Sequence, residues 1–73
     1  MVLVGESYIY TGKDNISHKN GKTYQVVSIG EHWVKEFGNV IWVTTEKYGD
    51  TLDIDYCHSY SPKYFKHHFY KAT

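Results

Sequence analysis

Short runs in which hydrophobic and polar residues alternate recur along this chain, with glycine-containing turns between them. Alternation with a period of two is the pattern of a β-strand that buries one face. Gly5 is expected to mark a bend in the first strand and Gly30 to end the second. The polar segment 11–21 between them is long for a hairpin loop. The sequence predicts four such strands, over residues 2–10, 22–29, 39–47 and 51–58.

Each predicted strand has two assigned faces, because successive side chains of a strand point to opposite sides. In strand 22–29, Tyr24 and Val26 share one face, and Val27 and Ile29 share the other. Strand 39–47 has the strongest strand character, and we expect it at the centre of the sheet. The inner residues of the third and fourth strands are predicted to be Val40, Trp42, Leu52, Ile54 and Tyr56.

The C-terminal end carries a signal for the start of a helix. Ser61 followed by Pro62 is the pattern of an N-cap with proline at the first helical position. It predicts a short helical or 3₁₀ turn from Ser61 to about His67, followed by a last short strand over residues 69–71. The chain has 73 residues, which is room for one small domain. We therefore predict a single all-β domain of five strands over residues 1–73.

The order of these elements resembles that of the Src-homology-three-like small β-barrels encoded by many phages and low-GC bacteria. The resemblance rests on Gly-Lys-Thr-Tyr-Gln-Val-Val-Ser-Ile at residues 21–29 and on Ser-Pro-Lys-Tyr-Phe at residues 61–65. In those barrels a one-turn 3₁₀ helix precedes the final strand. The resemblance implies a small five-stranded, partly open barrel with one short 3₁₀ or helical turn before the last strand. It implies a fold and no activity.

Composition and charge narrow the range of partners. The net charge is zero, which removes a general attraction to nucleic acid or to anionic membranes. No apolar run approaches the roughly 18 residues that cross a bilayer, so we expect no membrane partner. A lone cysteine, Cys57, excludes an internal disulfide and fits a cytoplasmic setting. The chain uses lysine and no arginine, which suggests an AT-rich genome such as that of a low-GC bacterium or its phage.

Histidine and cysteine side chains near the C-terminus are the first candidates for chemistry. Cys57 and His58 are adjacent in a predicted strand, so they point to opposite faces and do not easily share one metal ion. The same difficulty separates His67 from His68 on a helical turn. Acidic residues beside Cys57 also disfavour a nucleophilic thiolate. We expect neither a zinc site nor a catalytic cysteine.

Carboxylates between residues 50 and 55 are the second candidate. Asp50, Asp53 and Asp55 lack the further oxygen ligands and the downstream glutamate of a calcium loop. A solvated strand face explains them better. The chain is therefore predicted to have no enzymatic activity and no cofactor.

An aromatic segment at residues 31–38 predicts protein binding. Trp33 and Phe37 lie among the charged residues Glu31, Lys35 and Glu36, and exposed rings with a charged rim are typical of an interface hot spot. The alternative is that Trp33 folds back as a lid on the core. The first interpretation predicts a small adaptor or inhibitor from a phage or mobile element that engages a host or viral protein.

The C-terminal end supports an alternative function. Residues 56–73 contain lysines and no acid, and lysines beside stackable rings hold single-stranded nucleic acid without reading its sequence. The residues of this alternative site are Tyr60, Lys63, Tyr64, Lys66 and Lys71. Self-association is a third option, because an open barrel leaves strand edges unpaired.

Overall fold

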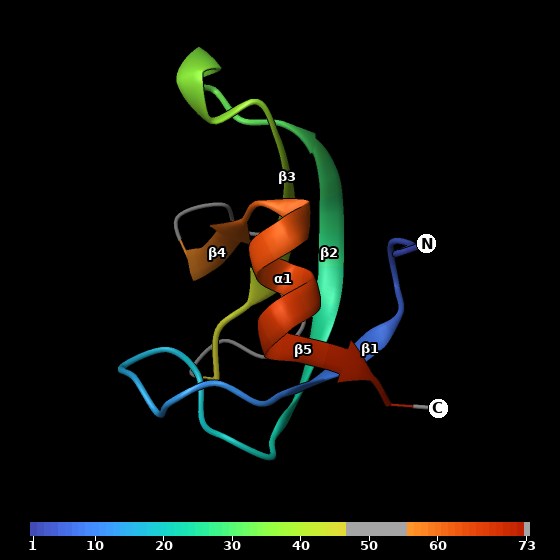
Figure 1. Ribbon diagram of the computed structural model, residues 1–73, viewed down its shortest axis with the longest axis vertical. Coiled ribbons are helices and arrows are strands. Elements are labelled where there is room, and N and C mark those ends of the chain that lie inside the picture. Colours follow the sequence, from blue (N-terminus) through green and yellow to red (C-terminus); the bar gives the residue numbers. More distant parts are fainter. Residues whose placement is uncertain (47–55, 73) are drawn as a thin grey trace.

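The computed structural model describes residues 1–46 and 56–72 of the chain. In this part the protein is mostly β, with five antiparallel strands in one open sheet, one α-helix and one 3₁₀ helix (Figure 1). The elements are β1 (Ser7–Tyr10), β2 (Thr23–Glu31), η1 (Lys35–Phe37), β3 (Asn39–Thr44), β4 (Cys57–Tyr60), α1 (Pro62–His68) and β5 (Phe69–Lys71). The strand order across the sheet is β4-β3-β2-β1-β5.

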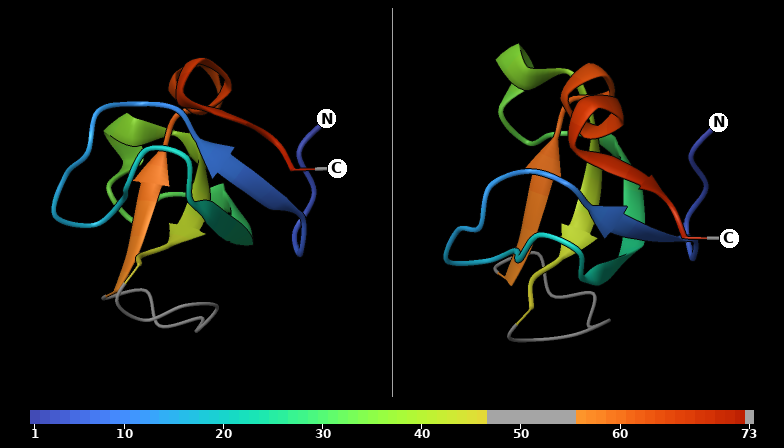
Figure 2. Two further views of the ribbon diagram at one scale, coloured as in Figure 1. Left: turned by 90° about the horizontal axis from the view of Figure 1, so that it is seen from below. Right: turned by 60° about the horizontal axis from the view of Figure 1, so that its bottom comes forward.

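The last strand of the chain returns to lie beside the first. Ile9 of β1 faces Tyr70 of β5 in an antiparallel pair. β2 joins the two halves of the sheet, since it pairs with β1 near its start and with β3 over the rest. A bulge between Val26 and Ser28 interrupts the second pairing, and bulges bend a strand and increase its twist. In Figure 2, β1 and β5 accordingly run crosswise to β3 and β4.

One hydrophobic core joins the strands to α1. Phe65 is the contribution of α1: it is 1% exposed and stands edge-on to Tyr8, with ring centroids 4.9 Å apart. Tyr24 and Val26 are both buried in this core, which confirms that they share one face of β2 and shows that this face is the inner one. The buried members of the cluster are Tyr8, Tyr10, Tyr24, Val26, Ile41, Val43, Phe65 and Phe69.

β3 is buried on both faces, which the predicted alternation did not anticipate. Val40 and Trp42 are buried as expected, but the core cluster contains their neighbours Ile41 and Val43. A strand covered on both sides reads as a continuous hydrophobic run, so its pattern does not identify the inner face. The prediction of Tyr56 as an inner residue is wrong: it precedes β4 and its side chain is 41% exposed.

Strand boundaries differ from the prediction in several places. β1 begins at Ser7, because Gly5 adopts a left-handed φ of +92° in the turn before it. The expected bend at Gly5 is thus confirmed. β2 does not end at Gly30, which pairs with Val40 inside the ladder. Residues 51–55 of the predicted fourth strand, with Leu52 and Ile54, lie outside the described residues.

The C-terminal elements follow the prediction closely. The Ser61 side chain accepts a hydrogen bond from the backbone N–H of Tyr64, and Pro62 opens α1. β5 follows at once over Phe69–Lys71. α1 is too short to cross a bilayer, and it is the longest helix among residues 1–46 and 56–72.

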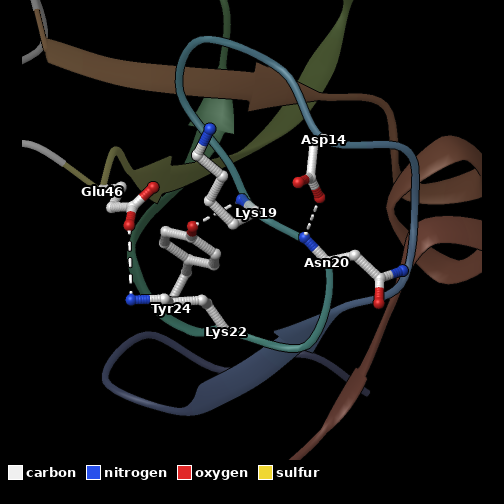
Figure 3. A network of polar contacts seen from close by, with 6 residues as sticks. All are labelled: Asp14, Lys19, Asn20, Lys22, Tyr24 and Glu46. Atoms are coloured by element: carbon white, nitrogen blue, oxygen red, sulfur yellow. Dashed lines mark hydrogen bonds and ion pairs between the residues drawn. The ribbon is translucent and has the colours of Figure 1, made fainter.

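The segment between β1 and β2 forms a compact loop that turns back onto the sheet. The carboxylate of Asp14 accepts a hydrogen bond from the backbone N–H of Asn20 at 2.7 Å, and the backbone N–H of Lys19 donates to the Tyr24 hydroxyl at 2.7 Å. Lys22 and Glu46 form an ion pair of 3.4 Å beside them (Figure 3). Within this loop His18 is fully buried, which the polar sequence did not predict.

Candidate protein-interaction site

The connection between β2 and β3 forms a protruding hairpin end. The backbone N–H of His32 donates to the carbonyl of Gly38 at 2.9 Å and closes the loop. Gly38 follows η1 with a φ of +64°, a left-handed conformation that favours glycine. In Figure 1 this loop lies at one end of the molecule, opposite the loop between β1 and β2. We call residues 31–38 the aromatic loop.

Two rings, His32 and Trp42, form a support at the base of the aromatic loop, and the ring of Trp33 packs against both. His32 and Trp33 lie 4.3 Å apart, and each lies 5.2 Å from Trp42 of β3, measured between ring centroids. Both rings are nearly parallel to that of Trp42, at 16° for His32 and 19° for Trp33. Stacked rings at these separations attract each other beyond their burial alone. The loop therefore has a fixed ring arrangement.

A hydrogen bond fixes the orientation of the His32 ring. The backbone N–H of Val34 donates to Nδ1 of His32 at 2.9 Å, so the neutral imidazole carries its proton on Nε2. Phe37 stands edge-on to this ring, with centroids 4.8 Å apart and planes at 81°. His32 thus connects both large aromatic residues of the loop.

The support is buried while the two outer rings are exposed. Trp33 is 64% and Phe37 is 61% exposed, whereas His32 is 7% and Trp42 is 6% exposed. Trp33 therefore does not fold back as a lid on the core. The predicted rim residues Glu31, Lys35 and Glu36 are also exposed, so the structure brings all five predicted residues onto one hairpin end.

Sequence reasoning missed the two supporting residues of the aromatic loop. His32 was absent from the predicted site, and Trp42 was assigned to the inner face of the barrel. The register of β2 with β3, which pairs Glu31 with Asn39, brings His32 close to Trp42. This register depends on the conformation of the loop, which the sequence alone does not give.

The alternative site at the C-terminal end is only partly assembled. Tyr64 stacks on Tyr60, with centroids 5.4 Å apart, and on His68, with centroids 3.9 Å apart. Two neighbouring rings therefore cover part of Tyr64, although 47% of this residue stays exposed. Lys71 is engaged elsewhere, because its Nζ lies 2.7 Å from a Glu6 carboxylate oxygen.

Two cations of the alternative site remain available. Lys63 and Lys66 lie on the exposed surface of α1 and form no ion pair within the described residues. Tyr60 is part-buried, and burial raises the pKa of its hydroxyl. This end can contact phosphate through the two lysines, and the ring of Tyr64 beside them is 47% exposed.

The histidine and cysteine residues near the C-terminus do not gather into a metal site in the described structure. Nδ1 of His68 lies 3.0 Å from the carbonyl of Tyr64, one turn back along α1. Across residues 1–46 and 56–72, no three His, Cys, Asp or Glu side chains lie close enough to hold a metal ion. Asp50, Asp53 and Asp55 lie outside this range.

Comparison of the chain with protein-family models, with curated proteins and with solved structures finds no match.

Proposed function

We propose that this chain is a non-enzymatic binding protein that engages another protein through the aromatic loop. The observation that carries the proposal is the exposure of Trp33 and Phe37, each above 60%, over a buried support of His32 and Trp42. Exposed aromatic residues that are already held in place are the usual anchors of protein interfaces. The chain would act as an adaptor or inhibitor of a host or viral protein in the cytoplasm of a host cell.

Preorganisation is the physical reason that favours this loop over other surfaces. Ordering a free side chain on binding costs about 0.5–1.5 kcal/mol, and stacking of Trp33 on Trp42 has already restricted its ring. Burying the exposed part of a large ring returns about 25 cal/mol per Å². Glu31, Lys35 and Glu36 surround the rings and supply a polar rim that orients a partner.

We further propose that the sheet is a partly open Src-homology-three-like barrel. Three features support the proposal: β5 returns beside β1, α1 directly precedes β5, and the bulged β2 links two crosswise halves of the sheet. The short helix stands where the resembling barrels carry their 3₁₀ turn. An experimental structure that shows β1 and β4 far apart across a flat sheet would contradict this fold.

Affinity capture with matched variants tests the function. A tagged chain is expressed in cells of its source and cross-linked, and the captured proteins are identified by mass spectrometry. We expect one partner that is retained by the control Lys63→Ala/Lys66→Ala and lost with Trp33→Ala/Phe37→Ala. Purified partner and chain should then bind directly in calorimetry. Retention of the partner by Trp33→Ala/Phe37→Ala would overturn the proposal.

A further inference from the structure

His18 is a buried residue that makes contact with every strand of the sheet. Its ring lies 5.5 Å from Tyr10 on β1 and 4.5 Å from Tyr24 on β2, measured between centroids. Tyr60 on β4 and Phe69 on β5 lie at 5.8 and 5.9 Å. Its Nε2 lies 3.0 Å from the carbonyl of Thr44 at the end of β3. A side chain from the loop between β1 and β2 thus fills the space enclosed by five strands.

Both ring nitrogens of His18 have a hydrogen-bond partner in the buried site. A carbonyl only accepts hydrogen bonds, so Nε2 carries the proton and donates to Thr44. Nδ1 lies 3.2 Å from the Tyr60 hydroxyl and, in the neutral ring, accepts a hydrogen bond from it. Protonation of Nδ1 would require the Tyr60 hydroxyl to change from donor to acceptor. It would also place a positive charge on a residue with 0% exposure.

His18 is also the main anchor of its loop. Of residues 11–21, only Ser17 and His18 are buried, and Ile16 is 98% exposed. Other attachments of the loop are hydrogen bonds. The carbonyl of Ser17 accepts from the backbone N–H of Glu46 at 2.9 Å, and Oγ of Ser17 lies 2.6 Å from Nε2 of His58. The hydroxyl of Tyr10 donates to the carbonyl of Lys13, and that of Tyr24 accepts from the N–H of Lys19. Loss of the His18 contacts would leave the loop attached by hydrogen bonds of this kind, without its largest buried side chain.

The groups around His18 disfavour its charged form. Burial lowers the pKa of His18 to about 4, and positive charge on nearby His58 acts in the same direction. Glu46 and the Thr44 carbonyl favour the cation but are outweighed. The remaining titratable groups that face the ring, Tyr10, Tyr24 and Tyr60, are phenols that stay neutral in acid.

We propose that His18 is an acid-sensitive latch, which holds the loop of residues 11–21 against the sheet while neutral and releases it when protonated. Release uncovers the rings of Tyr10, Tyr24, Tyr60 and Phe69, which gives this small domain a second, conditional apolar surface. This device is independent of the aromatic loop, which lies at the opposite end of the molecule (Figure 1).

Linkage gives the direction and size of the effect. A histidine whose pKa is lower in the latched state than its ordinary value of 6.5 binds more protons when released. The latch is therefore fully closed above pH 6.5 and weakens as the pH falls toward 4. With these two values the equilibrium constant for release rises about 30-fold between pH 7.5 and pH 5.

Hydrogen exchange followed by NMR tests the latch in the full chain. The amides of Lys19 and Glu46 report on the loop. The amide of Lys19 donates to the hydroxyl of Tyr24 on β2, and the amide of Glu46 donates to the carbonyl of Ser17 in the loop. The amide of Val26, bonded to Glu6 within the β1–β2 pair, reports on the sheet. After correction for intrinsic rates, we expect protection of the loop amides to fall about 30-fold at pH 5 while that of Val26 is unchanged.

Matched variants identify the titrating group. His18→Gln keeps a donor for Thr44 without titrating, and His18→Phe keeps a ring; both should lose the acid response. The exposed residue His67 provides the control, and the His67→Gln variant should keep the acid response. Persistence of the response in His18→Gln or His18→Phe would overturn the proposal. Equal loss of protection at Val26 and at the loop amides would also overturn it, since that outcome is global unfolding.

Discussion

The indole rings of Trp33 and Trp42 stack with centroids 5.2 Å apart, yet the first is 64% and the second 6% exposed. Truncation of the two residues should therefore have different consequences. Trp42→Ala removes a buried aromatic residue and should lower the free energy of unfolding by about 3–5 kcal/mol. Trp33→Ala loses the ring contacts with Trp42 and His32, each of which contributes about 0.5–1.5 kcal/mol. Urea denaturation of the two variants measures both values.

The comparison also decides whether Trp33 belongs to the core. A loss of stability with Trp33→Ala as large as that with Trp42→Ala would mean that the ring is structural. In that case the docking role of the aromatic loop should be abandoned, whatever partner the chain binds.

Tryptophan fluorescence gives an independent measure of the same asymmetry. The chain has two tryptophans, so Trp42→Phe leaves Trp33 as the sole emitter and Trp33→Phe leaves Trp42. We expect red-shifted emission that acrylamide quenches readily from Trp33, and blue-shifted, protected emission from Trp42. Addition of the captured partner should protect Trp33. Emission of a buried indole from Trp33 in the free chain would contradict the exposure reported for it.

The sequence predicted those elements whose signals are local. Ser61 and Pro62 mark the start of α1 because a cap and a fixed φ act within one turn. Tyr24 and Val26 share one face of β2, as predicted, because that strand alternates. For β3 the run Val-Ile-Trp-Val has no polar residue to mark a face, so the inner residues were assigned to the wrong side.

The burial of His18 could not be predicted, because its partners are distant in the chain. It bonds to Thr44 and Tyr60, which are 26 and 42 residues away, and the surrounding loop is polar and has no periodicity. The same reason explains why the sequence did not predict the ion pair between Lys71 and Glu6 of the N-terminal turn. Exposure of Trp33 and Phe37 was one of two alternatives that the sequence left open, and the hairpin conformation decides it.

The N-cap of α1 offers a prediction about stability. Ser61→Ala removes the acceptor for the backbone N–H of Tyr64 and should lower the free energy of unfolding by about 1 kcal/mol. Ser7→Ala, on the exposed side of β1, is the matched control and should change it by less than about 0.5 kcal/mol. Thermal and urea denaturation measure both. Equal effects of the two substitutions would contradict a specific capping role.

The ion pair between Lys71 and Glu6 offers a prediction about pKa. The hydrogen bond from Lys71, with the backbone N–H of Leu3, holds the pKa of Glu6 below its ordinary value of 4.5. Stability from this pair is therefore fully present above pH 4.5 and is lost as the pH falls below it. Lys71→Gln should raise the pKa of Glu6, as measured by ¹³C NMR of the carboxyl group. Lys66→Gln, which removes a cation that forms no ion pair within residues 1–46 and 56–72, should leave the pKa of Glu6 unchanged.

Nucleic-acid binding is the alternative that a salt titration can decide. With Lys63 and Lys66 as the available cations of α1 and Lys71 paired with Glu6, contacts to a single strand should be weak and mainly electrostatic. Two neutralised phosphates give a slope of log K against log salt of about −1.4. Fluorescence anisotropy with a labelled single-stranded oligonucleotide should therefore show weak binding at low salt, none at physiological salt, and none at any salt with Lys63→Ala/Lys66→Ala. Tight binding at physiological salt with a much steeper slope, lost in that double variant, would contradict this expectation. The proposed function would then be single-strand binding at the C-terminal end, in place of protein binding through the aromatic loop.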